Sequence, residues 1–169
     1  GLMALAPEII RIIGGAEYDS GKFVVVPMIM DAFILFLYNI IVPSEYYMKK
    51  TQYIMLGTLI SAVINLITNY IFIKRLGFIA AAYTTLFSYV CYLVLHIIIS
   101  RYLIGFEVVK WKHIIIAVVI SAVAGAIDLL FVNDIILRYV VCMIVVIALG
   151  LLLIRYYRDT KLQYMKGSQ

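Results

Sequence analysis

Five long apolar segments, separated by short polar connections, constrain the fold of this chain more than any other feature of its sequence. Each segment is long enough to cross the roughly 30 Å hydrocarbon layer of a membrane, for which a helix needs about 20 mostly apolar residues. The segments cover residues 23–42, 53–73, 78–100, 113–132 and 135–154. We therefore predict an all-α fold, a polytopic bundle of transmembrane helices that forms a single domain over residues 1–169.

The overall composition agrees with a membrane bundle. Hydrophobic residues make up 66% of the 169 residues and charged residues only 14%, and the mean hydropathy is +1.09. Soluble domains are about 45–50% apolar and about 25% charged. The composition therefore excludes a soluble enzyme, a disordered chain and a disulfide-stapled secreted module. Cys91 and Cys142 fall inside apolar segments, where we expect them to pack as small hydrophobic residues.

The apolar stretch at residues 2–13 differs from the other five. It is too short to cross a membrane and contains Pro7, Glu8 and Arg11. We interpret it as the end of a sixth helix that begins upstream. The chain is then expected to be the C-terminal part of a longer protein, with five complete spans and the end of a sixth.

Basic residues are distributed unequally between the two sides of the predicted bundle. One side carries nine of them: Lys49, Lys50, Arg101, Lys110, Lys112, Arg155, Arg158, Lys161 and Lys166. The other side carries five: Arg11, Lys22, Lys74, Arg75 and Arg138. Because cytoplasmic loops are enriched in Lys and Arg, we predict a multi-pass protein of the cytoplasmic membrane with a cytoplasmic tail at residues 155–169. The net charge of +5 then reflects topology, and no nucleic-acid partner is expected.

Asp31 is the most informative polar residue, because it lies near the middle of the first predicted span. A carboxylate at that depth costs about 2.5–3.5 kcal/mol on insertion scales. Pro27, one turn earlier, removes a backbone hydrogen bond and can bend the helix. Asp31 is therefore a candidate for a proton or cation site, or for the wall of a substrate path. The alternative is a protonated carboxyl group bonded to a neighbouring helix.

Small and polar residues recur every four positions in the second and third spans, which places them on one helix face. The second span carries Gly57, Ser61, Asn65 and Asn69, and the third carries Ala80, Thr84, Ser88, Tyr92 and His96. Such stripes are typical of closely packed membrane helices. We regard Asn65, Asn69, Thr84 and Ser88 as packing residues or as part of a substrate path or ion-coupling site. His96 is interpreted as a satisfied or snorkelling histidine rather than as a proton relay.

The sequence shows no arrangement typical of catalysis or metal binding. Its two histidines, His96 and His113, are not spaced with Ser and Asp as in a triad, and no Cys/His cluster has zinc spacing. We therefore predict no catalytic residue, no metal site, no cofactor and no enzymatic activity.

Three segments resemble bacterial oligosaccharide flippases. Residues 65–85 read NLITNYIFIKRLGFIAAAYTT, which is similar to a recurrent pattern of a helix ending N-x-x-x-N-Y, a short basic turn with Gly, and an Ala-rich helix start. Residues 6–10 (APEII), followed by Gly14-Gly15 and Tyr18, resemble the segment after the seventh helix of that family. Tyr47, Lys49-Lys50 and Thr51 resemble the loop that enters its ninth helix. The resemblance covers about residues 4–100.

The resemblance implies membership of the multidrug/oligosaccharidyl-lipid/polysaccharide exporter superfamily, which includes the MATE drug antiporters. Such proteins have two six-helix bundles around a central cavity and work by alternating access, so the five spans would be the eighth to the twelfth helices. The implied substrate is an undecaprenyl-pyrophosphate-linked oligosaccharide repeat unit for lipopolysaccharide or capsule. The implied partners are this lipid-linked oligosaccharide, membrane lipids and other polysaccharide-assembly membrane proteins.

Other functions stay open at the level of the sequence. In a MATE-type cation-coupled multidrug exporter, Asp31 would bind the coupling ion. A membrane-embedded cell-envelope transferase would need catalytic residues elsewhere, and a purely structural membrane subunit would leave Asp31 unexplained. No Lys or Arg lies deep in any of the five spans. Arg138 falls within the last span, but it is only four residues from the start of that span. A basic pyrophosphate site is therefore expected in the N-terminal half of the longer protein.

Overall fold

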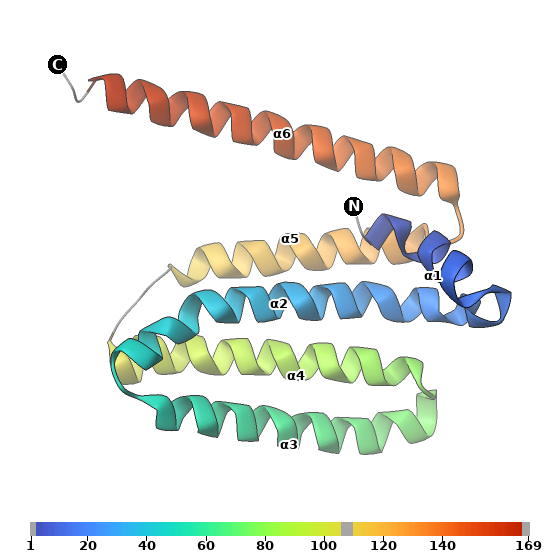
Figure 1. The fold of residues 1–169 in the computed structure, drawn as a ribbon, viewed down its shortest axis with the longest axis horizontal. Coiled ribbons are helices and arrows are strands. Elements are labelled where there is room, and N and C mark those ends of the chain that lie inside the picture. Colours follow the sequence, from blue (N-terminus) through green and yellow to red (C-terminus); the bar gives the residue numbers. More distant parts are fainter. Residues whose placement is uncertain (1–2, 106–109, 167–169) are drawn as a thin grey trace.

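The structure is a computed structural model that describes residues 3–105 and 110–166, and every regular element in these ranges is helical (Figure 1). This confirms the predicted all-α membrane bundle. The α-helices are α1 (Ala6–Gly14), α2 (Lys22–Tyr47), α3 (Thr51–Leu76), α4 (Ile79–Ile98), α5 (Trp111–Leu130) and α6 (Ile135–Lys166). Two 3-10 helices, η1 (Met3–Leu5) and η2 (Ala16–Gly21), flank α1, and a π-helix, η3 (Ile99–Ile104), follows α4.

Four helical segments are long and apolar enough to cross a membrane. They are Glu17–Tyr47, Thr51–Leu76, Ile79–Tyr102 and Trp111–Leu130. The first two extend beyond the predicted spans at both ends, because polar residues at the ends of these runs continue the same helices. The third begins at Ile79, one residue later than predicted, and the fourth ends at Leu130, two residues earlier than predicted. In α6 the described apolar part is Ile135–Ile147, and α6 continues as one helix into the predicted tail. The side chains of residues 148–149, 152–153, 156–157 and 159–166, and the whole of residues 167–169, lie outside the described residues.

Two tight turns reverse the chain around α3. Gly77 has a φ of 77°, a left-handed conformation that favours glycine, and its N–H donates to the carbonyl oxygen of Ile73 to end α3. Between α2 and α3, Lys49 also adopts a positive φ of 55°. In that turn the backbone N–H of Lys50 donates to the carbonyl oxygen of Glu45 at 2.9 Å. Both turns are short, so α2, α3 and α4 run antiparallel to their sequence neighbours.

Helix α4 is the central element of the bundle. It packs against α3 on one side and α2 on the other, and α5 packs on α2 (Figure 1). The apolar core joins α2, α4 and α5 through residues such as Ile34, Ile41, Leu93 and Ile114. By contrast, 6% of the most apolar stretch of α3 is buried, against 39% of that of the α4 segment. Helix α3 therefore lies at the edge of the bundle.

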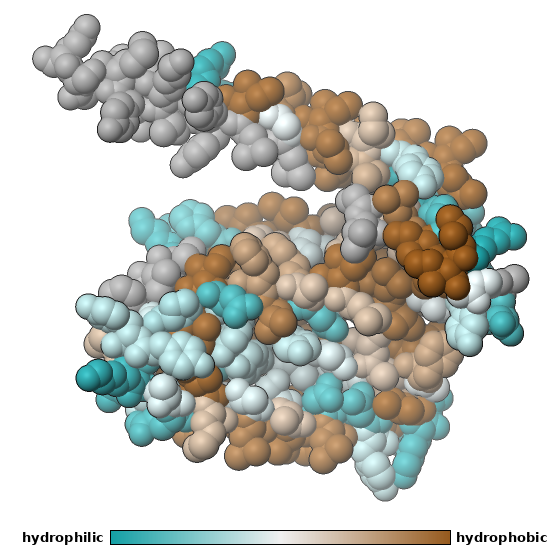
Figure 2. Space-filling view, in the orientation of Figure 1, coloured by the Kyte–Doolittle hydropathy of each residue, from teal (hydrophilic) through white to brown (hydrophobic). Residues whose placement is uncertain are grey.

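Much of the apolar surface is exposed, as a lipid environment requires. Large hydrophobic side chains such as Leu66 on α3 and Ile120 on α5 are more than half exposed. Figure 2 shows hydrophobic residues over much of the flank, with many of the most hydrophilic residues towards the ends of the helices. Contiguous apolar surface on this scale is unusual for a soluble monomer and marks a surface that contacts lipid or protein.

Candidate functional site

The amide and hydroxyl side chains of the two predicted stripes meet one another between α3 and α4. Thr84 Oγ1 donates a hydrogen bond to Asn69 Oδ1, and Asn69 Nδ2 donates to Asn65 Oδ1 at 3.0 Å. Asn65 Nδ2 in turn donates to Thr85 Oγ1 at 3.3 Å. These four residues form a continuous chain of hydrogen bonds that ties the two helices together. Polar bonds of this kind stabilise contacts between helices in an apolar environment.

Ser88 takes part in the same helix contact through its backbone. Its Oγ donates to the carbonyl oxygen of Thr84 within α4 at 2.8 Å. Its own carbonyl oxygen accepts a hydrogen bond from Ser61 Oγ of α3 at 3.1 Å. The small side chains of Ser61 and Ser88 allow the two helices to approach closely enough for this bond.

An open groove of about 380 Å³ lies beside this network, between α2, α3 and α4. We call it the polar groove, and ten residues line it: Leu35, Tyr38, Thr58, Ser61, Ala62, Asn65, Thr85, Ser88, Tyr89 and Tyr92. Asn65 and Ser88 are therefore in its wall. Asn69 lies one helical turn beyond Asn65 on α3 and is not among the lining residues. Thr84 lines a separate, more apolar cavity near Phe72 and Phe87.

The chemistry of the polar groove is that of hydroxyl, amide and aromatic groups. None of its ten lining residues carries a charge. Thr58 Oγ1 lies 3.2 Å from the hydroxyl oxygen of Tyr92 and donates to the carbonyl oxygen of Ile54 at 2.8 Å. Tyrosine offers both an apolar ring face and a hydroxyl group. Such a surface can bind uncharged, hydroxyl-rich molecules, and it offers no cation to a phosphate.

Asp31 does not join the amide network. It is half-buried on α2, and its buried Oδ1 makes no hydrogen bond within the described part of the chain. Leu35, one helical turn further on, lines the polar groove. Because residues four apart share one face of a helix, Asp31 lies on the side of α2 that leads into the groove. Helix α2 continues through Pro27, so the proline does not end it.

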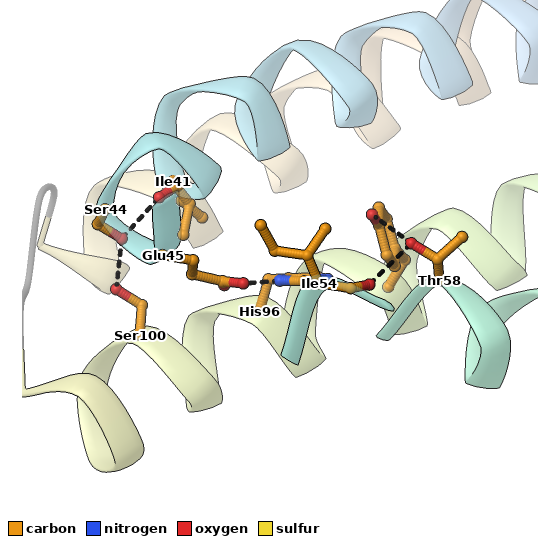
Figure 3. Close-up of polar contacts among 8 residues, drawn as sticks. Ile41, Ser44, Glu45, Ile54, Thr58, His96 and Ser100 are labelled. Carbon is orange, nitrogen blue, oxygen red and sulfur yellow. Dashed lines mark hydrogen bonds and ion pairs between the residues drawn. The ribbon is translucent and has the colours of Figure 1, made fainter. Parts of the chain in front are cut away.

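Sequence reasoning missed the pairing of Glu45 with His96. Glu45 follows the predicted first span, residues 23–42, yet it lies inside α2. Its Oε1 is 2.6 Å from His96 Nδ1 of α4, and both side chains are fully buried (Figure 3). The interpretation of His96 as snorkelling is therefore wrong, whereas the expectation of a satisfied histidine holds at Nδ1. The sequence did carry one signal for this pairing, which was spacing. Glu45 lies seven residues after Tyr38 and His96 lies four residues after Tyr92, so each shares a helix face with a tyrosine.

A second buried charge lies at the opposite end of the bundle. Arg138, near the start of α6 and four residues into the last predicted span, is 2% exposed. Its Nη1 donates to the carbonyl oxygen of Val132 at 2.8 Å, and its Nη2 bonds Glu8 of α1. The arginine thus connects the N-terminal segment to the turn between α5 and α6. Among the described residues, no group of three or more His, Cys, Asp and Glu side chains could hold a metal ion.

Comparison with known proteins gives one informative similarity. Over 113 residues the chain is 28% identical to the probable low-salt glycan biosynthesis flippase Agl15 of Haloferax volcanii. The chain is similar to a flippase. The match covers 67% of this chain and 23% of that protein, so the chain spans about a quarter of its relative. No family model matches the chain, and no solved structure matches it.

The similarity and the helical bundle support a coarse description. The chain is a multi-pass membrane protein with four helices long and apolar enough to span a membrane, and it resembles a protein named as a flippase.

Proposed function

We propose that this chain is the C-terminal helix bundle of a flippase that moves a lipid-linked oligosaccharide across the cytoplasmic membrane. The observation that carries the proposal is the polar groove, which presents hydroxyl, amide and tyrosine groups and no charged side chain, beside Leu35 and Ala62, between three largely apolar helices. A glycan is rich in hydroxyl groups and cannot cross hydrocarbon, so a carrier must offer it such a path. The similarity to a probable glycan biosynthesis flippase supports a glycan as the cargo.

In this proposal the polar residues in and near the groove have different roles. Asn65 and Ser88 contact sugar hydroxyl groups from the groove wall, whereas Asn69 and Thr84 hold α3 against α4. Asp31, one turn from the groove, lines the substrate path or takes part in ion coupling. The lysine-rich and arginine-rich side, which includes the turn at Lys49 and Lys50, faces the cytoplasm.

The groove is not the site of the pyrophosphate in an undecaprenyl-pyrophosphate-linked substrate. Its walls hold no Lys or Arg, and phosphate groups are usually bound by such side chains or by helix N-termini. We place the pyrophosphate site in the N-terminal half of a longer protein. In that arrangement the two halves move against one another, so that the glycan site between them opens first to one side of the membrane and then to the other. Related repeats move in this way in many transporters.

A MATE-type cation-coupled drug exporter is the second candidate. It is favoured by Asp31 alone, whose buried Oδ1 makes no hydrogen bond within the described residues and could bind a coupling ion.

Deletion of the full-length gene tests the proposal against this alternative. We expect surface polysaccharide to be lost and lipid-linked intermediates to accumulate on the cytoplasmic side, because only translocation is blocked. Reintroducing the wild-type gene should restore both, as measured by surface glycan staining and analysis of lipid extracts. Normal surface glycan in a deletion strain without a second carrier would contradict the proposal, and drug sensitivity with intact glycan would favour the exporter.

A further inference from the structure

Five basic side chains gather at one end of the bundle, although they come from segments far apart in the sequence. We call Lys49, Lys50, Arg101, Lys110 and Lys112 the basic patch. They belong to the turn between α2 and α3, to η3 after α4, and to the start of α5, which all lie at the same end of the bundle (Figure 1). Ser44 Oγ of α2 and Ser100 Oγ of η3 share a hydrogen bond of 3.3 Å, which joins two of these segments. This is the end that our topology predicts to be cytoplasmic.

The basic patch is exposed, and the described residues around it do not neutralise its charge. All five side chains are exposed, and none of them forms an ion pair within the described part of the chain. The described segments at this end, residues 43–53, 97–105 and 110–114, contain one acidic residue, Glu45. Glu45 is fully buried and is bonded to His96. The patch therefore presents its positive charge to whatever surrounds this end of the protein.

At the opposite end of the bundle, basic residues are mixed with acidic ones. Lys22 Nζ lies 2.7 Å from Asp19 Oδ2, and Arg138 Nη2 bonds Glu8. Asp134, in the turn between α5 and α6, adds an exposed carboxylate there. The two ends therefore differ in unpaired charge, and not only in their number of Lys and Arg residues.

Aromatic side chains accompany the basic patch. The guanidinium carbon of Arg101 lies 5.4 Å from the ring centre of Tyr102 and 5.9 Å from that of Trp111. These cation–π contacts link η3 to the start of α5. Tyr47, at the end of α2, is also exposed. Tyrosine and tryptophan are enriched at the boundary between hydrocarbon and lipid headgroups. Arg101 and Lys112 directly flank two of the predicted spans, so the patch lies at the depth of the headgroups.

We propose that the basic patch binds the phosphate headgroups of anionic membrane lipids. Their negative charge complements the patch, and they lie at the depth where the aromatic side chains are found. Each basic residue close to an anionic lipid surface strengthens binding by about fivefold. The partner is the surrounding membrane and not the cargo, so this inference goes beyond the proposed transport. It is tested without a glycan, and its failure would leave the proposed glycan transport untouched.

The test is photo-crosslinking of the full-length protein in nanodiscs that contain phosphatidylglycerol and phosphatidylcholine in equal amounts. The photoreactive residue benzoylphenylalanine replaces Tyr47, which is 80% exposed beside the patch. In the matched control it replaces Phe78, which is 61% exposed at the opposite end and lines a cavity with Tyr18, between the acidic Glu17 and Asp19 in the sequence. Mass spectrometry of the adducts gives the ratio of anionic to neutral lipid at each position. We expect phosphatidylglycerol to exceed phosphatidylcholine by about fivefold or more at Tyr47, and by clearly less at Phe78.

Charge variants separate the basic patch from general contact with lipid. Lys49→Gln/Lys50→Gln should lower the lipid ratio at Tyr47 towards that of the nanodisc. Lys74→Gln/Arg75→Gln makes the matching change in the exposed turn at the opposite end and should leave the ratio at Tyr47 unchanged. Added sodium chloride should also lower this ratio, because salt screens exposed charges, and inorganic phosphate at the same ionic strength should lower it no further.

Four results would overturn the proposal. They are adducts at Tyr47 in the ratio of the nanodisc, an equal excess of phosphatidylglycerol at Tyr47 and Phe78, and an excess at Tyr47 that survives Lys49→Gln/Lys50→Gln. The fourth is selective displacement of the lipid by inorganic phosphate, which would show that the patch takes the free anion instead of a headgroup.

Discussion

Gly57→Leu is expected to remove most of the folded protein from the membrane. A Cβ atom at Gly57 would overlap the imidazole of His96 and come within 3.2 Å of Leu95 Cδ2. Overfilling a packed interior ordinarily costs about 1–3 kcal/mol, and more when a fixed ring blocks the way. His96 cannot yield easily, because Tyr38 and Tyr92 contact it and Glu45 is bonded to it.

Membrane abundance and thermal stability in detergent measure this effect, by immunoblot and by size-exclusion chromatography after heating. Gly150→Leu is the matched control, because it also replaces a glycine inside a helix, but nothing lies within 4 Å of a Cβ atom there. The control is expected to behave as the wild type. Wild-type abundance and stability of Gly57→Leu would show that α3 does not approach His96 as closely as the structure has it.

Asp31→Asn is expected to reduce transport strongly while leaving abundance in the membrane unchanged. The amide is close to the carboxyl group in size, so packing on α2 is preserved while the charge and the exchangeable proton are lost. Interactions of a charged group are worth about 1.5–3 kcal/mol, which corresponds to a fall of roughly ten- to a hundredfold in rate. Transport is measured as rescue of surface glycan in the deletion strain, titrated against the amount of protein.

The control for Asp31→Asn is Asp134→Asn, an exposed acid in the turn between α5 and α6. It should rescue as the wild type does. Wild-type rescue by Asp31→Asn would remove Asp31 from the mechanism. Loss of abundance would instead mean that Asp31 is a packing residue, which was the alternative left open by the sequence.

Hydrophobic patterning predicted the parts of the fold that depend on local information. The apolar runs predicted the helices, and the four-residue spacing placed Asn65 with Asn69 on one face of α3 and Thr84 with Ser88 on one face of α4. A short turn between two helices forces them to be neighbours, so the register of this pair follows from the turn at Gly77. The hydrogen-bond chain from Thr84 to Thr85 is a consequence of that register.

Contacts between segments far apart in the sequence were not predictable in the same way. The pair of Glu45 and His96 depends on how α2 lies against α4, and no short turn connects those helices. The hydropathy pattern also led us to end the first predicted span at residue 42. Glu45 lowers the local mean hydropathy even though it is buried against His96. The burial of Arg138 was not predictable for the same reason, since it depends on Glu8, 130 residues earlier in the chain. A buried charged residue can be predicted from the sequence only when its ion-pair partner is identified at the same time.

The most direct test of the central claim is a translocation measurement with the full-length protein in liposomes. A pyrophosphate-linked oligosaccharide is incorporated in both leaflets, and the fraction of glycan that an external glycosidase can reach is followed over time, with and without a proton or sodium gradient. We expect the protected fraction to become accessible far faster than in protein-free liposomes. We also expect Asn65→Leu, which removes an amide from the polar groove, to slow this exchange. Protection equal to that in protein-free liposomes under every gradient, with the protein folded and inserted, would contradict the account.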